Sequence, residues 1–153
     1  MIRDAAETDI PELVRLRGLL FDSLSDAWGA APPGEDWHAA CARELRQGLT
    51  AGAMKVLVID AGGGLAACGI GVLDRRLPGP YNPVGVVGHV FGVVTDPAYR
   101  GRGYARATTE ALLAWLRSTG VTTVDLHATP EAEPLYRSLG FRDPDDRALT
   151  LRF

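Results

Sequence analysis

A long apolar run that passes through a glycine- and arginine-rich turn into a helix is the feature that most restricts what this chain can fold into. Residues 84–95 are mainly apolar and rich in β-branched side chains, which predicts a central strand. Asp96-Pro97 ends that strand, and a turn over 100–103 leads into a segment with helical spacing of apolar residues. A buried strand followed directly by a helix is typical of a mixed α/β domain.

The other periodic segments predict further helices and strands. We expect helices over residues 10–24, 35–49, 103–119 and 130–139. We expect strands over residues 2–5, 54–60, 65–73, 84–95, 121–127, at Phe141 and over 147–153. The chain has 153 residues, no internal repeat and no linker, so we expect residues 1–153 to form a single domain.

Composition excludes several classes of function. A net charge of −3 argues against non-specific binding of nucleic acid, and no apolar run reaches the ~20 residues of a membrane span. The charged N-terminal segment lacks the apolar run of a signal peptide, so we expect a cytoplasmic protein. From the charge and the short apolar runs, we expect it to bind neither nucleic acid nor membrane. Cys41 and Cys68 form no CxxC motif and have no histidine at zinc-ligand spacing, which predicts reduced thiols and no metal site.

The turn before the third predicted helix has the composition of an anion site. Gly101 and Gly103 let backbone N–H groups approach a ligand, and a helix N-terminus concentrates unsatisfied donors. Arg100, Arg102 and Arg106 add positive charge, so the turn suits a phosphate or pyrophosphate. A simple turn with solvated arginines is the alternative. A P-loop is excluded because this turn contains no lysine, and a dinucleotide fingerprint is excluded because Arg106 replaces the third glycine.

Two motifs give the chain a resemblance to a known family. The block V-x-x-D-P-x-Y-R-G-R-G-Y-A over residues 93–105 resembles motif A of the GCN5-related N-acetyltransferases (GNAT), with Arg100, Gly103 and Ala105 on its Q/R-x-x-G-x-G/A core. Residues 135–141, LYRSLGF, resemble the second signature of the family, and the order of elements over the whole chain is similar. The resemblance implies an α/β (α+β) GNAT fold. That fold has a central mixed, mostly antiparallel sheet of six to seven strands, four flanking helices and a splay between strands 4 and 5.

The resemblance also implies a reaction, the transfer of an acetyl group from acetyl-CoA, as co-substrate, to an amine. In GNAT enzymes the fourth strand holds the pantetheine arm through its backbone, and the following turn and helix start hold the pyrophosphate. A backbone N–H near Val93 or Val94 would polarise the thioester carbonyl. The residues implied to bind the cofactor are Val93, Val94, Thr95, Arg100, Gly101, Arg102, Gly103, Tyr104, Ala105 and Arg106.

Two residues are candidates for proton transfer. Tyr136 stands where family members place a tyrosine that protonates the departing thiolate; a tyrosine packed between helix and sheet is the alternative. His89 lies eleven residues before Arg100, where some members carry a glutamate base, and histidine changes charge near neutral pH. A satisfied polar residue on a half-buried strand is the alternative for His89. A water relay could replace it as the base.

The acceptor site is less well defined by sequence. Thr129 replaces an asparagine that in the family contacts the cofactor arm, so its hydroxyl either makes that contact or the contact is lost. His127 is an alternative base or a residue that contacts the acceptor. For both His127 and Thr129, the other interpretation is that they cap the start of the next helix. Further candidates for the acceptor site are Phe21, Trp28 and Tyr81, followed by Trp37, His38 and Asn82. An acidic segment could attract a cationic amine; it holds Asp22, Asp26, Glu35 and Asp36.

The expected function is acetylation of the primary amine of a small molecule, by direct attack in a ternary complex. Two alternatives remain open: acetylation of a protein N-terminus or lysine, and an acetyl-CoA-binding sensor or interaction module without turnover. The expected partner is the small-molecule amine, and a homodimer is one open form of assembly.

Overall fold

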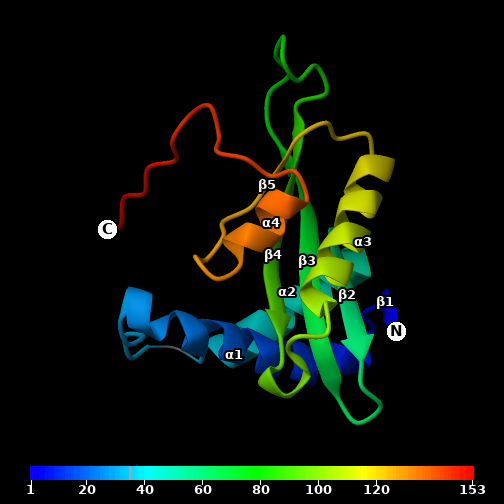
Figure 1. Cartoon of the computed structure of the whole chain (residues 1–153), viewed down its shortest axis with the longest axis vertical. Coiled ribbons are helices and arrows are strands. Elements are labelled where there is room, and N and C mark those ends of the chain that lie inside the picture. Colours follow the sequence, from blue (N-terminus) through cyan, green and yellow to red (C-terminus); the bar gives the residue numbers. More distant parts are fainter. Residues whose placement is uncertain (35) are drawn as a thin grey trace.

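The computed structural model describes residues 1–34 and 36–153. Its helices are α1 (Ile10–Trp28), α2 (Trp37–Ala51), α3 (Tyr104–Ser118) and α4 (Glu133–Ser138), with 3-10 turns η1 (Glu7–Asp9) and η2 (Pro97–Tyr99). Its strands are β1 (Ile2–Asp4), β2 (Met54–Asp60), β3 (Leu65–Arg75), β4 (Val86–Thr95) and β5 (Val124–Asp125) (Figure 1). None of the helices in the described ranges is long and apolar enough to cross a membrane.

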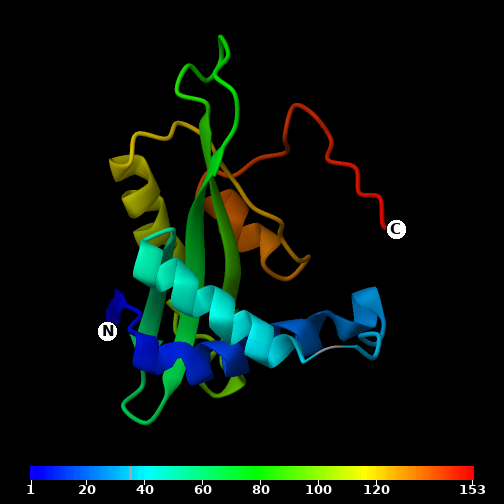
Figure 2. The ribbon, with the colours of Figure 1, turned by 180° about the vertical axis from the view of Figure 1, so that it is seen from behind.

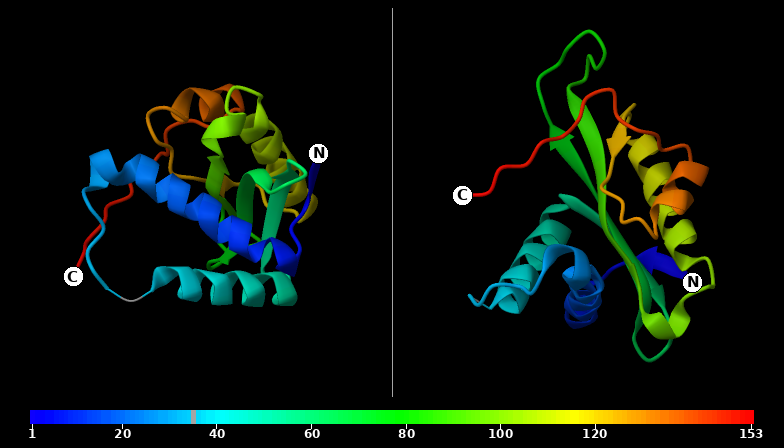
Figure 3. Two further views of the ribbon diagram at one scale, coloured as in Figure 1. Left: turned by 90° about the horizontal axis from the view of Figure 1, so that it is seen from below. Right: turned by 60° about the vertical axis from the view of Figure 1, so that its left-hand side comes forward.

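The strands form one sheet in the order β1-β2-β3-β4-β5, with a helical layer on each side. The pairings from β1 to β4 are antiparallel, and β4 pairs with β5 in parallel. Figure 3 shows α1 and α2 on one face and α3 with α4 on the other, and Figure 2 shows α1 and α2 lying across the strands. This arrangement confirms the expected mixed α/β fold.

Each helical layer buries an apolar stripe against the sheet. Leu16 of α1 and Leu112 of α3 are both fully buried on opposite faces. Gly69 and Gly71 of β3 let α3 come close, because a Cβ on Gly69 would lie 2.6 Å from the Thr108 Cγ2 atom. The close approach fixes the start of α3 relative to the end of β4, where the glycine-rich turn lies.

Strands β4 and β5 part after a short contact. Their pairing is limited to Gly88 with Val124 and His89 with Asp125, and β4 then continues to Thr95. Within that unpaired stretch β4 also carries a bulge, since Ile70 pairs with Phe91 whereas Cys68 pairs with Val94. The expected splay between the fourth and fifth strands is therefore present, and one backbone edge of β4 is left open to a ligand.

Several predicted boundaries were wrong. Helix α1 continues past residue 24 to Trp28, because residues 25–28 contain no glycine or proline and Gly29 is the first breaker that follows. Helix α2 begins at Trp37, and the predicted start at residue 35 lies outside the described residues. Helix α3 spans 104–118 and α4 begins only at Glu133, after a turn closed by the Thr129 carbonyl.

Within residues 1–34 and 36–153 the sheet has five strands rather than six or seven. The strand expected over 121–127 shrinks to two residues, and Phe141 and residues 147–153 form no strand. The apolar alternation of Leu149, Leu151 and Phe153 suggested a strand, yet all three side chains are exposed. A strand requires a ladder partner, and the chain after β5 leaves the sheet edge, so this segment has no strand to pair with.

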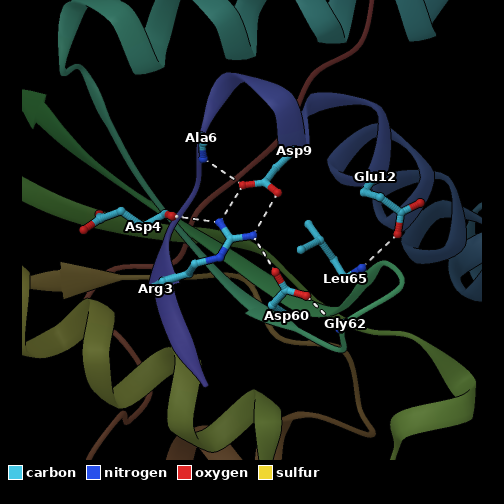
Figure 4. Close-up of polar contacts among 8 residues, drawn as sticks. All are labelled: Arg3, Asp4, Ala6, Asp9, Glu12, Asp60, Gly62 and Leu65. Atoms are coloured by element: carbon cyan, nitrogen blue, oxygen red, sulfur yellow. Dashed lines mark hydrogen bonds and ion pairs between the residues drawn. The ribbon is translucent and has the colours of Figure 1, made fainter.

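An ion-pair network fixes the N-terminal part of the sheet (Figure 4). Arg3 donates to the Asp9 carboxylate at 2.7 Å and to the Asp60 carboxylate at 2.9 Å, which joins β1 to η1 and to the end of β2. Glu12 of α1 accepts a hydrogen bond from the Leu65 N–H at 2.9 Å, at the start of β3. These contacts fix α1 against the same end of the sheet.

Candidate active site

The glycine-rich turn is built as an open nest of N–H groups. Gly101 and Gly103 have φ angles of 77° and 78°, in the left-handed region that favours glycine, and a Cβ on either would meet no atom within 4 Å. Gly103 is the N-cap of α3. The backbone N–H groups of residues 101–106 donate no hydrogen bond within the described part of the chain. The turn therefore presents unpaired donors at the positive end of a helix, which suits an anion.

The arginines of this turn have different surroundings. Arg102 lies over the Tyr99 ring, 5.2 Å from its centroid. Arg106 donates to the Ser138 hydroxyl at 2.6 Å and so joins α3 to α4. Arg100 is exposed and makes no ion pair with any described residue. Within the described residues, Arg100 makes no hydrogen bond, ion pair or ring contact through its side chain, and Arg102 makes only the contact with Tyr99, so both are free to turn toward a bound anion.

Helix α1 also fixes the start of the turn, through a contact with Asp96. Asp96 accepts hydrogen bonds from the Ala98 N–H at 2.9 Å and from the Arg15 guanidinium at 2.7 Å. These two contacts lower the pKa of the Asp96 carboxyl. Tyr104 packs with Tyr99 against the β1–β3 end of the sheet, so its side chain is part of the core. The Tyr104 backbone N–H remains among the unpaired donors of the turn.

The side chains of the predicted pantetheine strand point into the two cores. Val93 reaches toward Gly69 under α3, whereas Val94 is buried between β4 and α1. Thr95 ends the strand and is half-buried. The two valines therefore offer a ligand their backbone rather than their side chains, along the edge that β5 leaves open.

His89 is paired with a carboxylate that sequence analysis missed. The His89 Nδ1 atom lies 2.6 Å from the Asp125 Oδ1 atom across the β4–β5 ladder. The Asp125 carboxylate also forms an ion pair with the Arg76 guanidinium at 3.4 Å. A carboxylate accepts, so Nδ1 carries the hydrogen and Nε2 of the neutral ring keeps its lone pair. The His127 ring lies 6.0 Å away, edge to face. Nothing in the sequence specified which residue of the short fifth strand would face His89.

Tyr136 lies in the wall of the same cleft as His89. An open cleft of about 1550 Å³ lies between β4, β5, α4 and the C-terminal segment, and His89, Asp125, His127 and Tyr136 all line it. Tyr136 is 7% exposed, and its burial raises the pKa of the phenol. No hydrogen bond within the described residues involves its hydroxyl. The phenol therefore stays protonated at neutral pH and is free to donate.

The remaining predicted residues are scattered. Thr129 accepts a weak hydrogen bond from the Ala132 N–H at 3.3 Å, in the turn before α4. Phe21 lies on the α1 side of the sheet and contacts Trp28 and Trp37, with centroids 6.4 and 5.9 Å apart. Tyr81 is 97% exposed at the tip of the β3–β4 hairpin, away from these groups.

Only some carboxylates of the predicted acidic segment are free to contact a ligand. Asp36 caps α2 by accepting from the His38 N–H at 2.9 Å and also contacts the His38 ring at 3.1 Å. Asp22 and Asp26 are exposed, and residue 35 lies outside the described ranges. The segment therefore does not converge on His89.

Curated relatives share short stretches with this chain. A serotonin N-acetyltransferase of rice is 46% identical over 57 residues, which are 37% of this chain and 28% of that protein. A glucosamine 6-phosphate N-acetyltransferase of rice is 38% identical over 88 residues, which are 56% of this chain and 52% of that protein. A mycothiol acetyltransferase of Thermobispora bispora is 48% identical over 60 residues, 37% of this chain and 20% of that protein. The chain thus spans at most about half the length of these relatives.

Solved structures share the fold over nearly the whole chain. A predicted acetyltransferase of Clostridium acetobutylicum with acetyl-CoA has a TM-score of 0.87 at 22% identity, over 99% of this chain and 95% of that one. A glucosamine-6-phosphate N-acetyltransferase of Arabidopsis thaliana has a TM-score of 0.76 at 21% identity, over 99% of this chain and 97% of that one. A model of the acetyltransferase (GNAT) family matches residues 19–141. The chain belongs to the GNAT family of acetyltransferases.

Proposed function

We propose that this protein transfers the acetyl group of acetyl-CoA to the primary amine of a small molecule, by direct attack in a ternary complex. The pyrophosphate binds the unpaired N–H groups of residues 101–106 with help from Arg100, and the pantetheine arm follows the open edge of β4 over 93–95. The unpaired donors, the left-handed glycines and the short β4–β5 pairing support this placement.

The observation that carries the proposal is that His89, Asp125 and Tyr136 line one cleft where β4 and β5 part. The Nε2 lone pair of His89 accepts a proton from the amine as its nitrogen attacks the thioester carbonyl carbon. The carbon–sulfur bond then breaks, and the Tyr136 hydroxyl gives its proton to the departing thiolate. Asp125 holds the His89 ring and stabilises the charge it gains.

Direct attack is favoured over an acetyl-enzyme because neither cysteine is an activated nucleophile. Burial raises the pKa of the Cys68 thiol to about 12 and that of the Cys41 thiol above its ordinary value. Cys68 is 4% exposed and donates to the Gly92 carbonyl at 3.6 Å. At neutral pH both thiols are protonated, so acetyl transfer to sulfur has no thiolate to begin from.

The substrates for which the relatives are named support a small acceptor rather than a protein. Serotonin and glucosamine 6-phosphate, which appear in those names, are small amines. Residues 143–148 of the C-terminal segment border the open cleft beside His89. This border limits the length of chain that can reach the base.

The test combines binding with turnover. Titration calorimetry should give saturable binding of acetyl-CoA, and thiol release should then require an amine from a panel of amino acids, amino sugars, arylalkylamines and one lysine-containing peptide. Y136F should bind acetyl-CoA as tightly as the wild type and release thiol more slowly. Absence of acetyl-CoA binding overturns the whole assignment, whereas binding without turnover on any amine favours the sensor function. Faster turnover on the peptide than on any small amine favours protein acetylation.

A further inference from the structure

One half-buried arginine lies on the α1 side of β4, outside the residues assigned so far. Arg17 projects from α1, and its Nη1 atom lies 3.6 Å from the position of a Cβ built on Gly92, at the bulge of β4. Its Cζ atom is 5.0 Å from the centroid of the Phe21 ring and 6.0 Å from that of Phe91. The guanidinium therefore lies close to two aromatic rings, beside the irregular part of the strand.

Arg17 has no anionic partner in the described chain. The arginines that are not exposed are Arg3 and Arg17, and Arg3 is satisfied by the carboxylates of Asp9 and Asp60. Arg17 makes no hydrogen bond or ion pair with any residue of the ranges 1–34 and 36–153. A partly desolvated guanidinium without a carboxylate loses hydration that a cation–π contact replaces only in part. Such a group is suited to an anion from outside the chain.

The arginine is close to the proposed reaction centre. The His89 ring stacks on the Phe91 ring with centroids 5.7 Å apart, and the Arg17 guanidinium lies near that same Phe91 ring. A single ring thus separates the proposed base from an unpaired cation. One small molecule can therefore place an amine at His89 and an acidic group at Arg17.

We propose that Arg17 binds a carboxylate or phosphate on the acceptor, so that the substrate is an anionic amine rather than a simple cationic one. This inference rests on the proposed acetyl transfer and specifies its substrate class. Arginine presents a planar fork of donors that matches both oxyanions. The Phe21 and Phe91 rings border this fork and supply apolar surface for the body of the acceptor.

The experiment uses amine pairs that differ by one acidic group: tyrosine against tyramine for the carboxylate, and glucosamine 6-phosphate against glucosamine for the phosphate. In at least one pair the wild type should favour the anionic member by about 10- to 100-fold in kcat/KM. R17Q should remove that preference by raising KM for the anionic member alone, and R17K should keep part of it. R43Q is the matched control, because Arg43 is an exposed arginine of α2 without an ion-pair partner among the described residues.

Binding separates this inference from the proposed function. Calorimetry with the CoA-saturated enzyme measures acceptor affinity without turnover. Tighter binding of the anionic member that R17Q abolishes supports the anion site even where no acetylation occurs, in which case only the proposed function fails. Equal affinity, in both pairs, for the member with the acidic group and the member without it overturns the role of Arg17. An equal loss of activity on every amine in R17Q overturns it as well, and means that Arg17 is a structural contact between α1 and β4.

Discussion

At the scale of single residues, the proposed chemistry depends on a histidine whose ring is held by a carboxylate. The 2.6 Å contact between His89 and Asp125 fixes which ring nitrogen is free to accept a proton. Tyr136 is held by packing alone, with the Phe141 ring 6.0 Å away, edge to face. Each of these roles predicts a different kinetic defect.

Removal of the base should lower the rate most near neutral pH. H89A should reduce kcat/KM by about 100-fold or more, the usual contribution of a general base, and should eliminate an ionisation from the pH profile. D125N should cause a smaller loss, because the His89 ring loses the carboxylate that holds it in place. The pH dependence of thiol release checks both, and an unchanged profile in H89A contradicts the assignment.

Removal of the acid should depend on the leaving group. Y136F should lower kcat by about 10- to 100-fold while leaving acetyl-CoA affinity unchanged, because the phenol acts on the departing thiolate. An acetyl thioester of a more acidic thiol needs less protonation, so the defect should shrink with such a donor. Equal defects with both donors would mean that Tyr136 only packs against the sheet.

At the scale of elements, the central feature is the turn between β4 and α3. Its φ angles at Gly101 and Gly103 bring consecutive N–H groups to one side, and the contact of Arg15 with Asp96 holds its base against α1. A substitution in this turn should therefore affect binding of the cofactor as well as stability.

Two glycines give a matched test of the turn. Gly101 and Gly120 have φ angles of 77° and 90°, and neither Cβ would meet an atom within 4 Å, so alanine at each costs a similar strain of about 1 kcal/mol. G101A should also weaken acetyl-CoA binding several-fold because it disturbs the nest, whereas G120A, at the far end of α3, should not. Calorimetric affinity and thermal unfolding of both variants make the comparison. Equal affinities would place the pyrophosphate elsewhere.

Sequence reasoning succeeded where a local pattern decides the structure. The β-branched run up to Thr95 and the glycines after it were enough to predict the strand, the turn and α3. The partner of His89 and the end of the sheet could not be predicted, because both depend on how a two-residue strand pairs with β4. The alternation of apolar residues after residue 146 favours a β-strand locally, but no neighbouring strand pairs with this segment in the described structure. Arg17 escaped notice because only the fold shows that it lacks a carboxylate.

At the scale of the whole molecule, the Arg3 network predicts how stability depends on pH. The hydrogen bond from Arg3 is the largest cause that lowers the pKa of Asp9 in the folded state, and the Ala6 N–H adds to it. A carboxyl with a lowered folded pKa stabilises the protein above its unfolded value of ~3.9, and this contribution is lost as the pH falls through the folded pKa.

R3Q should therefore lower the melting temperature at pH 7 and make it less sensitive to acid. R46Q is the control, since Arg46 and Glu7 form an exposed pair, with side chains 53% and 66% exposed, that should contribute little. Thermal unfolding from pH 7 down to about pH 2 makes the comparison, because the contribution of Asp9 is lost below its unfolded value of ~3.9, as the pH falls through the lowered folded pKa. An R3Q melting curve parallel to that of the wild type at every pH would contradict the role of Asp9.

The most direct test of the central claim is the initial-rate pattern of thiol release when acetyl-CoA and an accepted amine are varied together. Direct transfer in a ternary complex predicts double-reciprocal lines that intersect, and no release of thiol in a first turnover without amine. Parallel lines, or a burst of thiol without amine, would mean that the acetyl group first passes to the protein, which would contradict direct attack assisted by His89 and Tyr136.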